Sequence, residues 1–149
     1  MTGFNHGMTG AVIALTVKQP LLAVPLSFIS HFVQDAIPHF GFSDARLFSR
    51  RFNVFLIADF LFSIFLMIIL GIMFPSSKWL IWECMIAAAS PDLMWAYYRL
   101  HVEHIKKHRP HYGSLAKLHI RVQWSQTIRG ALVEIAWFIA MGVIIIIKK

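Results

Sequence analysis

Two long, mostly apolar runs restrict what this chain can fold into. They cover residues 52–74 and 128–147, and each is as long as the ~20 apolar residues that cross a bilayer. Because the hydrocarbon core offers no water to backbone N–H and C=O groups, such runs fold as helices. A third run, residues 79–98, is nearly as apolar, but Ser90-Pro91-Asp92 interrupts it and predicts a kink. The sequence therefore predicts an all-α, polytopic membrane bundle.

The composition agrees with this class. Of 149 residues, 58% are hydrophobic and 14% are charged, whereas a soluble domain is about half apolar and about a quarter charged. The length suits one compact bundle, so we expect residues 1–149 to form a single transmembrane domain. The lone cysteine, Cys84, excludes an internal disulfide and a cysteine-based zinc site.

The first forty residues are less regular. Residues 8–17 and 21–36 are apolar, and Lys18-Gln19-Pro20 between them predicts a turn. Two short helices are therefore expected to form a hairpin, which either crosses the membrane or enters it and returns on the same side. We favour five membrane crossings over three crossings plus a re-entrant hairpin.

The cationic residues indicate an orientation. In the map with five crossings, ten of the 14 lysines and arginines fall on one side, and four fall on the other (Lys18, Lys78, Lys148 and Lys149). The positive-inside rule then predicts a multi-pass membrane protein with its N-terminus in the cytoplasm.

The net charge of +7 is assigned to basic loops that face anionic lipid headgroups. Membrane lipids, and no nucleic acid, are therefore the expected partners. Residues 99–127 are predicted to form a basic, amphipathic cytoplasmic loop on the headgroups. This loop contains five histidines, of which His119 is held as an additional ligand candidate: His101, His104, His108, His111 and His119.

The segment most suggestive of chemistry spaces His31, Asp35 and His39 four residues apart. Residues at i and i+4 share one helix face, so His31 and Asp35 can bind one ion together. Pro38 is expected to end the helix, which would let His39 turn inward from the loop. Imidazole and carboxylate are ligands of zinc-like and iron-like ions, and ionisable groups inside a membrane are costly.

Four further polar residues fall toward the same side of the predicted membrane. His6 and Asp92 are candidate metal ligands from neighbouring helices. Asp59 and Glu134 are candidates for the general base, or for groups that orient the histidines. Three or four ligands plus a water would make an open, catalytic metal site.

Each candidate also has a structural interpretation. The His31–Asp35 pair could join two helices by hydrogen bonds, His6 could be an interfacial or capping residue, and Asp92 could cap a helix. Asp59 and Glu134 could pair with basic residues near the interface, namely Arg50 or Arg129.

Three motifs carry a family resemblance: Asn5-His6-Gly7-Met8-Thr9-Gly10, residues 31–39, and Pro91-Asp92. Together they resemble small bacterial inner-membrane proteins described as predicted membrane-bound metal-dependent hydrolases, a family thought to be distantly similar to zinc-dependent phospholipase C. The resemblance covers roughly the first 100 residues. It implies hydrolase activity and a metal site with the ligands His6, Asp35, His39 and Asp92.

The function expected from these features is metal-dependent hydrolysis of a lipid-phase ester or phosphoester at the cytoplasmic face. The cofactor would be a divalent ion, with zinc preferred and manganese or iron as alternatives. A protein without enzymatic activity is the alternative. It would be a metal or proton carrier, or a small stabilising subunit of a membrane complex.

Overall fold

The computed structural model describes residues 1–41, 50–97 and 113–149, and every regular element in these segments is a helix. The predicted all-α fold is confirmed. The elements are α1 (Gly3–Val17), α2 (Pro20–Asp35), α3 (Arg50–Met73), α4 (Lys78–Ala89), the 3-10 turn η1 (Ser90–Asp92), α5 (Leu93–Tyr97), α6 (Ser114–Val122) and α7 (Gly130–Ile147).

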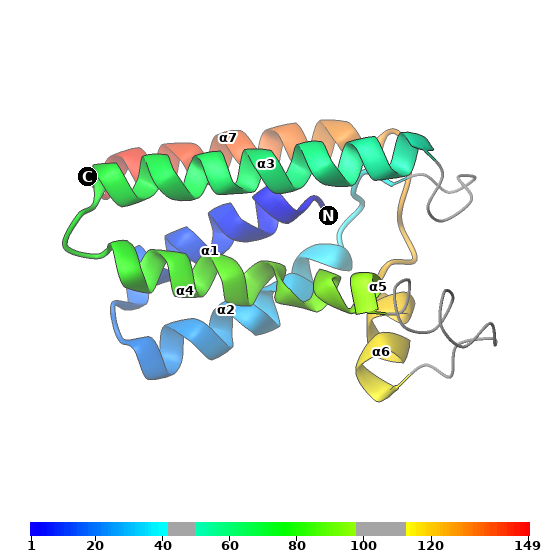
Figure 1. Cartoon of the computed structure of the whole chain (residues 1–149), viewed down its shortest axis with the longest axis horizontal. Coiled ribbons are helices and arrows are strands. Elements are labelled where there is room, and N and C mark those ends of the chain that lie inside the picture. Colours follow the sequence, from blue (N-terminus) through cyan, green and yellow to red (C-terminus); the bar gives the residue numbers. More distant parts are fainter. Residues whose placement is uncertain (42–49, 98–112) are drawn as a thin grey trace.

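Helices α3 and α7 run along the long axis of the molecule (Figure 1), and both are long and apolar enough to cross a membrane. Only 11% and 17% of their most apolar windows are buried in the protein, unlike the core helix of a soluble domain. Two such helices are fewer than the five crossings predicted. Helices α1 and α2 have 15 and 16 residues, which at ~1.5 Å per residue fall short of the ~30 Å hydrocarbon core.

The turn predicted between the first two helices is present. Lys18 adopts a left-handed conformation with φ 58° and donates its backbone N–H to the Ala14 carbonyl at 3.1 Å. Gln19 is extended, and Pro20 is the first residue of α2, a position where proline's missing N–H costs nothing. This turn folds α1 and α2 into a hairpin whose open end brings His6 next to residues of the α2 C-terminus.

The predicted interruption of the third apolar run is also present. Helix α4 ends at Ala89, and Ser90, Pro91 and Asp92 form the 3-10 turn η1 before α5 begins. Proline cannot supply the N–H that a continuing α-helix needs at this position. The interruption matters because it carries Asp92 beside the end of α2.

Helix α1 lies inside the bundle and packs closely on α4. Met8, Ala11 and Ala14 are buried in the same apolar core as Ile81 and Cys84. A close approach is at Gly10, where an added Cβ would overlap the Cys84 carbonyl oxygen.

Replacing Gly10 by alanine is therefore expected to destabilise the fold. The new methyl meets backbone that cannot move without separating α1 from α4, and overpacking of this kind costs roughly 1–3 kcal/mol. The measurement is the unfolding midpoint of the detergent-purified protein. Gly142→Ala is the matched control, because its Cβ would have no neighbour within 4 Å and alanine favours a helix. Equal midpoints for the two variants would contradict the close packing.

Candidate metal centre

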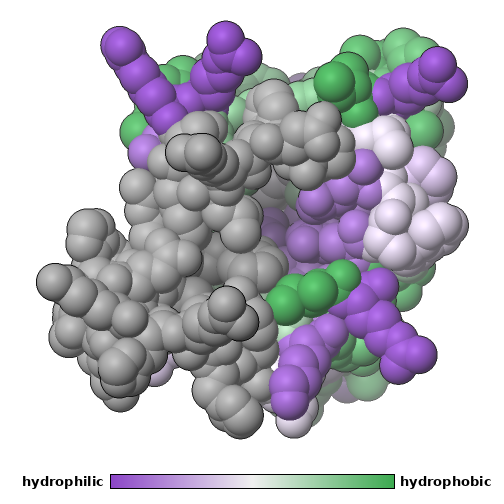
Figure 2. Space-filling model, turned by 90° about the vertical axis from the view of Figure 1, so that its right-hand side faces the viewer, coloured by the Kyte–Doolittle hydropathy of each residue, from purple (hydrophilic) through white to green (hydrophobic). Residues whose placement is uncertain are grey.

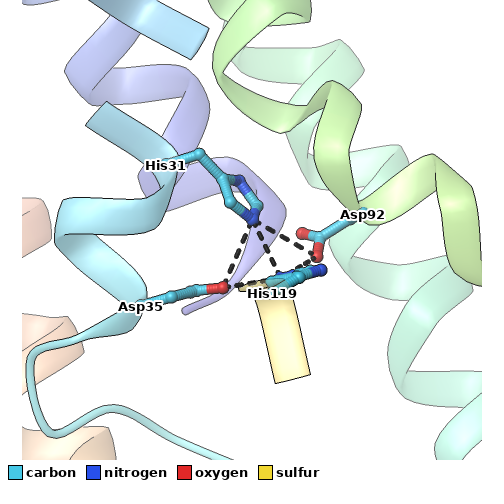
Figure 3. Close-up of side chains that lie close together, drawn as sticks. All are labelled: His31, Asp35, Asp92 and His119. Atoms are coloured by element: carbon cyan, nitrogen blue, oxygen red, sulfur yellow. Dashed lines mark hydrogen bonds and ion pairs between the residues drawn. The ribbon is translucent and has the colours of Figure 1, made fainter. Parts of the chain in front are cut away.

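Four side chains place their ligand atoms close together at one end of the bundle (Figure 3). They are His31 and Asp35 from α2, Asp92 from η1 and His119 from α6, and one ligand atom of each lies within 4.8 Å of the others. His31, Asp35 and His119 are buried, whereas the Asp92 side chain is 35% exposed. This group could hold a metal ion that is reached from the Asp92 side.

Asp35 is the centre of the group. Its Oδ2 atom lies 3.2 Å from His31 Nε2 and 2.8 Å from His119 Nε2. Its Oδ1 atom lies 3.2 Å from His6 Nε2 and accepts a hydrogen bond from the Met1 amine. One carboxylate thus contacts imidazoles from three helices, α1, α2 and α6.

The hydrogen bonds of His31 determine which of its nitrogens faces the group. Nδ1 lies 2.8 Å from the Ala88 carbonyl oxygen, which can only accept, so Nδ1 carries the proton. In the neutral ring, Nε2 then has no proton and carries a lone pair. This lone pair faces Asp35 Oδ2, and it faces His119 Nε2 at 3.0 Å. Metal-binding histidines are held by the same kind of Nδ1–H bond to a carbonyl. An acceptor nitrogen facing a carboxylate requires a cation or an extra proton between them.

The spacing of the two histidine nitrogens from each other and from the two carboxylates is close to that around a small divalent ion. Ligands about 2.1 Å from zinc in a tetrahedron lie about 3.4 Å from one another. The separations that involve His31 and His119 run from 2.8 to 3.8 Å, including 3.8 and 3.5 Å to Asp92 Oδ1. Two imidazoles and two carboxylates also match the donor preferences of zinc, and of iron or manganese.

Two further predicted ligands lie beside this group. The ring of His6 stacks on His31 with centroids 3.9 Å apart, and its Nε2 contacts the far oxygen of Asp35. His39 is buried, with Nδ1 2.8 Å from the Ile37 carbonyl oxygen and with no hydrogen-bond partner for Nε2 among the described residues. Burial lowers the pKa of His39, so its ring stays neutral. The structure therefore brings His6, but not His39, into contact with Asp35.

Asp59 and Glu134 accept hydrogen bonds from residues at the beginning of α1. Asp59 accepts hydrogen bonds from the backbone amides of Gly3 at 2.8 Å and Phe4 at 3.0 Å. Glu134 accepts from the Thr2 amide and hydroxyl, the Asn5 side chain and the Phe40 amide. Both carboxylates satisfy amides at a helix N-terminus, and neither belongs to the four-residue group. Their predicted role as general bases stays a prediction.

His119 joins the group although the sequence indicated it only as an additional candidate. It lies on the inward face of α6, one turn before Gln123, whose side-chain nitrogen is 2.9 Å from His119 Nε2. The spacing of apolar residues around His119 indicated an amphipathic helix, but nothing local indicated where that helix packs. The other histidines of the basic loop, residues 101–111, lie outside the described residues.

No known protein family, curated protein or solved structure matches the chain.

Proposed function

We propose that this protein is a membrane-embedded, metal-dependent hydrolase that acts on a lipid-phase ester or phosphoester, with zinc as its ion. The observation that carries the proposal is the convergence of His31 Nε2, His119 Nε2 and Asp35 Oδ2 on one buried point, with His31 Nδ1 bonded to a carbonyl. The resemblance to predicted membrane-bound hydrolases points in the same direction.

His31, Asp35, Asp92 and His119 would hold the ion, and His6 and His39 would be additional ligands. A bound divalent ion polarises a carbonyl or phosphoryl oxygen and acidifies water. Asp35, His31 and His119 are buried, whereas the partly exposed Asp92 would leave an approach for substrate. Asp59 or Glu134 is the proposed general base.

The exterior of the protein supports a lipid-phase substrate. Arg50 and Arg51 lie beside Val54, Phe55 and Ala58 on a shallow, open part of the surface of α3. Guanidinium groups next to apolar side chains suit a lipid with an anionic headgroup. This surface is at the beginning of α3, which Figure 1 shows at the same end of the molecule as α6.

We also propose a multi-pass protein of the inner membrane with five crossings and a cytoplasmic N-terminus. The split of ten to four lysines and arginines supports the orientation. Short helices can cross as well when the bilayer thins locally around them, and α2 supports this because Leu21, Ile29 and Val33 on its surface are exposed. Such side chains suit contact with lipid rather than water.

The test is hydrolysis of ester- and phosphoester-containing lipids by the detergent-purified protein, with zinc added or with a chelator. Activity is expected to depend on zinc and to be lost on replacing Asp35 and His39 by alanine. Glu83→Gln is the control, since it removes an exposed acid from α4 outside the metal centre. Activity that persists unchanged in the Asp35→Ala/His39→Ala variant would contradict the proposal.

One observation favours a role without catalysis. Asp35 joins imidazoles of α1, α2 and α6, as expected for a hydrogen-bond network that holds helices together. The chain would then be a metal or proton carrier, or a small subunit that stabilises a larger membrane complex. Co-purification with a partner and instability of the isolated chain would support the subunit role.

A further inference from the structure

Helix α6 lies at the end of the bundle and runs across the direction of α3 and α7 (Figure 1). Its inward face has the buried residues Ala116 and His119, and Gln123, just after the helix, follows His119 at a spacing of four residues. His119 on this face contacts Asp35 at 2.8 Å and His31 at 3.0 Å. The helix therefore covers the candidate metal centre and supplies one of its four ligands.

The rest of α6 is exposed and has two kinds of side chain. Leu115 and Leu118 form an apolar flank and are 45% and 46% exposed, and Trp124 just beyond the helix is 75% exposed. Lys117 and Arg121, one turn apart, are exposed beside this flank. Apolar side chains next to flexible cations are typical of a helix that lies in the headgroup region of a membrane.

The position of α6 in the molecule also suits a helix in the headgroup region of a membrane. Helix α3 begins at Arg50 and Arg51, and Arg129 precedes α7, so both candidate spans start with cations. These starts lie at the end of the molecule where α6 is found (Figure 1). Viewed from this end, the molecule presents hydrophilic residues next to hydrophobic ones (Figure 2). A helix turned across the spans at this level would lie parallel to the membrane surface.

We infer that α6 binds the surface of an anionic lipid leaflet, with Leu115, Leu118 and Trp124 inserted at the boundary between headgroups and acyl chains. Lys117 and Arg121 contact the anionic headgroups. Because α6 also supplies His119, binding of α6 to the leaflet helps to hold His119 in the metal centre. The inference rests on the membrane location in the proposed function, but it does not depend on hydrolysis.

Single cysteines labelled with an environment-sensitive fluorophore test the position of α6. The background is Cys84→Ala, because this buried thiol is the chain's only cysteine. The labelled variants are Leu118→Cys on the apolar flank of α6 and Phe65→Cys within α3. Each is reconstituted into vesicles of phosphatidylcholine alone or of an equimolar mixture with phosphatidylglycerol, and lipids with a nitroxide near the headgroup serve as quenchers.

In the mixed vesicles, the label at 118 is expected to be quenched and blue-shifted. Adding Lys117→Gln and Arg121→Gln should weaken the binding of α6 to the leaflet about five-fold for each cation, because each contributes about 1 kcal/mol near such a surface. The quenching at 118 should then fall toward its value in phosphatidylcholine alone. Zinc should also be lost to a chelator faster from this variant than from the parent.

The label in α3 separates two kinds of failure. If the label at 118 is water-like while the label at 65 is shielded from water, the inference about α6 is wrong and the membrane location stands. If both labels are water-like, the membrane location in the proposed function is wrong too. Quenching at 118 that is the same in both kinds of vesicle, and unchanged by removing the two cations, would overturn the preference for an anionic leaflet.

Discussion

Replacing His31 and Asp35 together by alanine is expected to abolish divalent metal binding. The double substitution removes the nitrogen and the carboxylate oxygen on which the group converges, which lie 3.2 Å apart. Loss of a residue that merely orients a ligand weakens metal binding 10–100-fold, so loss of two ligands should cost more than about 100-fold. Elemental mass spectrometry of protein never exposed to chelator should find about one ion per wild-type chain and almost none in the variant.

The matched control for this experiment is Ser30→Ala with Gln34→Ala. These residues are also one turn apart on α2 and also polar, and they bond each other and Thr9 rather than the four ligand atoms. The control variant should keep its metal even if it is less stable. Metal retained without His31 and Asp35 would contradict the candidate centre. No metal in the wild-type protein would favour a hydrogen-bond network and the role without catalysis.

Replacing Glu134 by glutamine is expected to destabilise the protein by about 2–4 kcal/mol. Oε1 accepts from the Thr2 and Phe40 amides, and Oε2 accepts from the Thr2 hydroxyl and the Asn5 side chain. An amide group accepts at one atom only, so the variant leaves buried donors without a partner, at about 1–3 kcal/mol each. The unfolding midpoint in detergent measures the effect, with Glu83→Gln, an exposed acid, as the control.

The same variant separates the two roles considered for Glu134. If this carboxylate is the general base, Glu134→Gln should lose hydrolytic activity at temperatures well below its unfolding midpoint. If it only holds the beginning of α1, activity should be retained at such temperatures. An unfolding midpoint equal to that of the wild type would show that the hydrogen bonds around Glu134 contribute little to stability.

Features that depend on neighbours in sequence could be predicted from the sequence. The apolar runs predicted the long helices α3 and α7, Lys18-Gln19-Pro20 predicted the turn of the hairpin, and Pro91 predicted the interruption that carries Asp92. The spacing of His31 and Asp35 predicted that both lie on one helix face. In the structure, His31 Nε2 lies 3.2 Å from Asp35 Oδ2. Each of these results follows from hydrophobicity, backbone chemistry or helix periodicity, all of which act over a few residues.

Only the tertiary structure decided how these features combine. His119 reaches Asp35 across 84 positions of sequence, and Glu134 reaches Thr2 across 132. Such contacts depend on which helix faces pack together, and no local sequence pattern indicates which faces these are. Packing also determined that Asp59 and Glu134 bond the start of α1. The sequence by itself thus determined the helices and part of the ligand set, whereas the fourth member of the cluster and the positions of the carboxylates came from long-range packing.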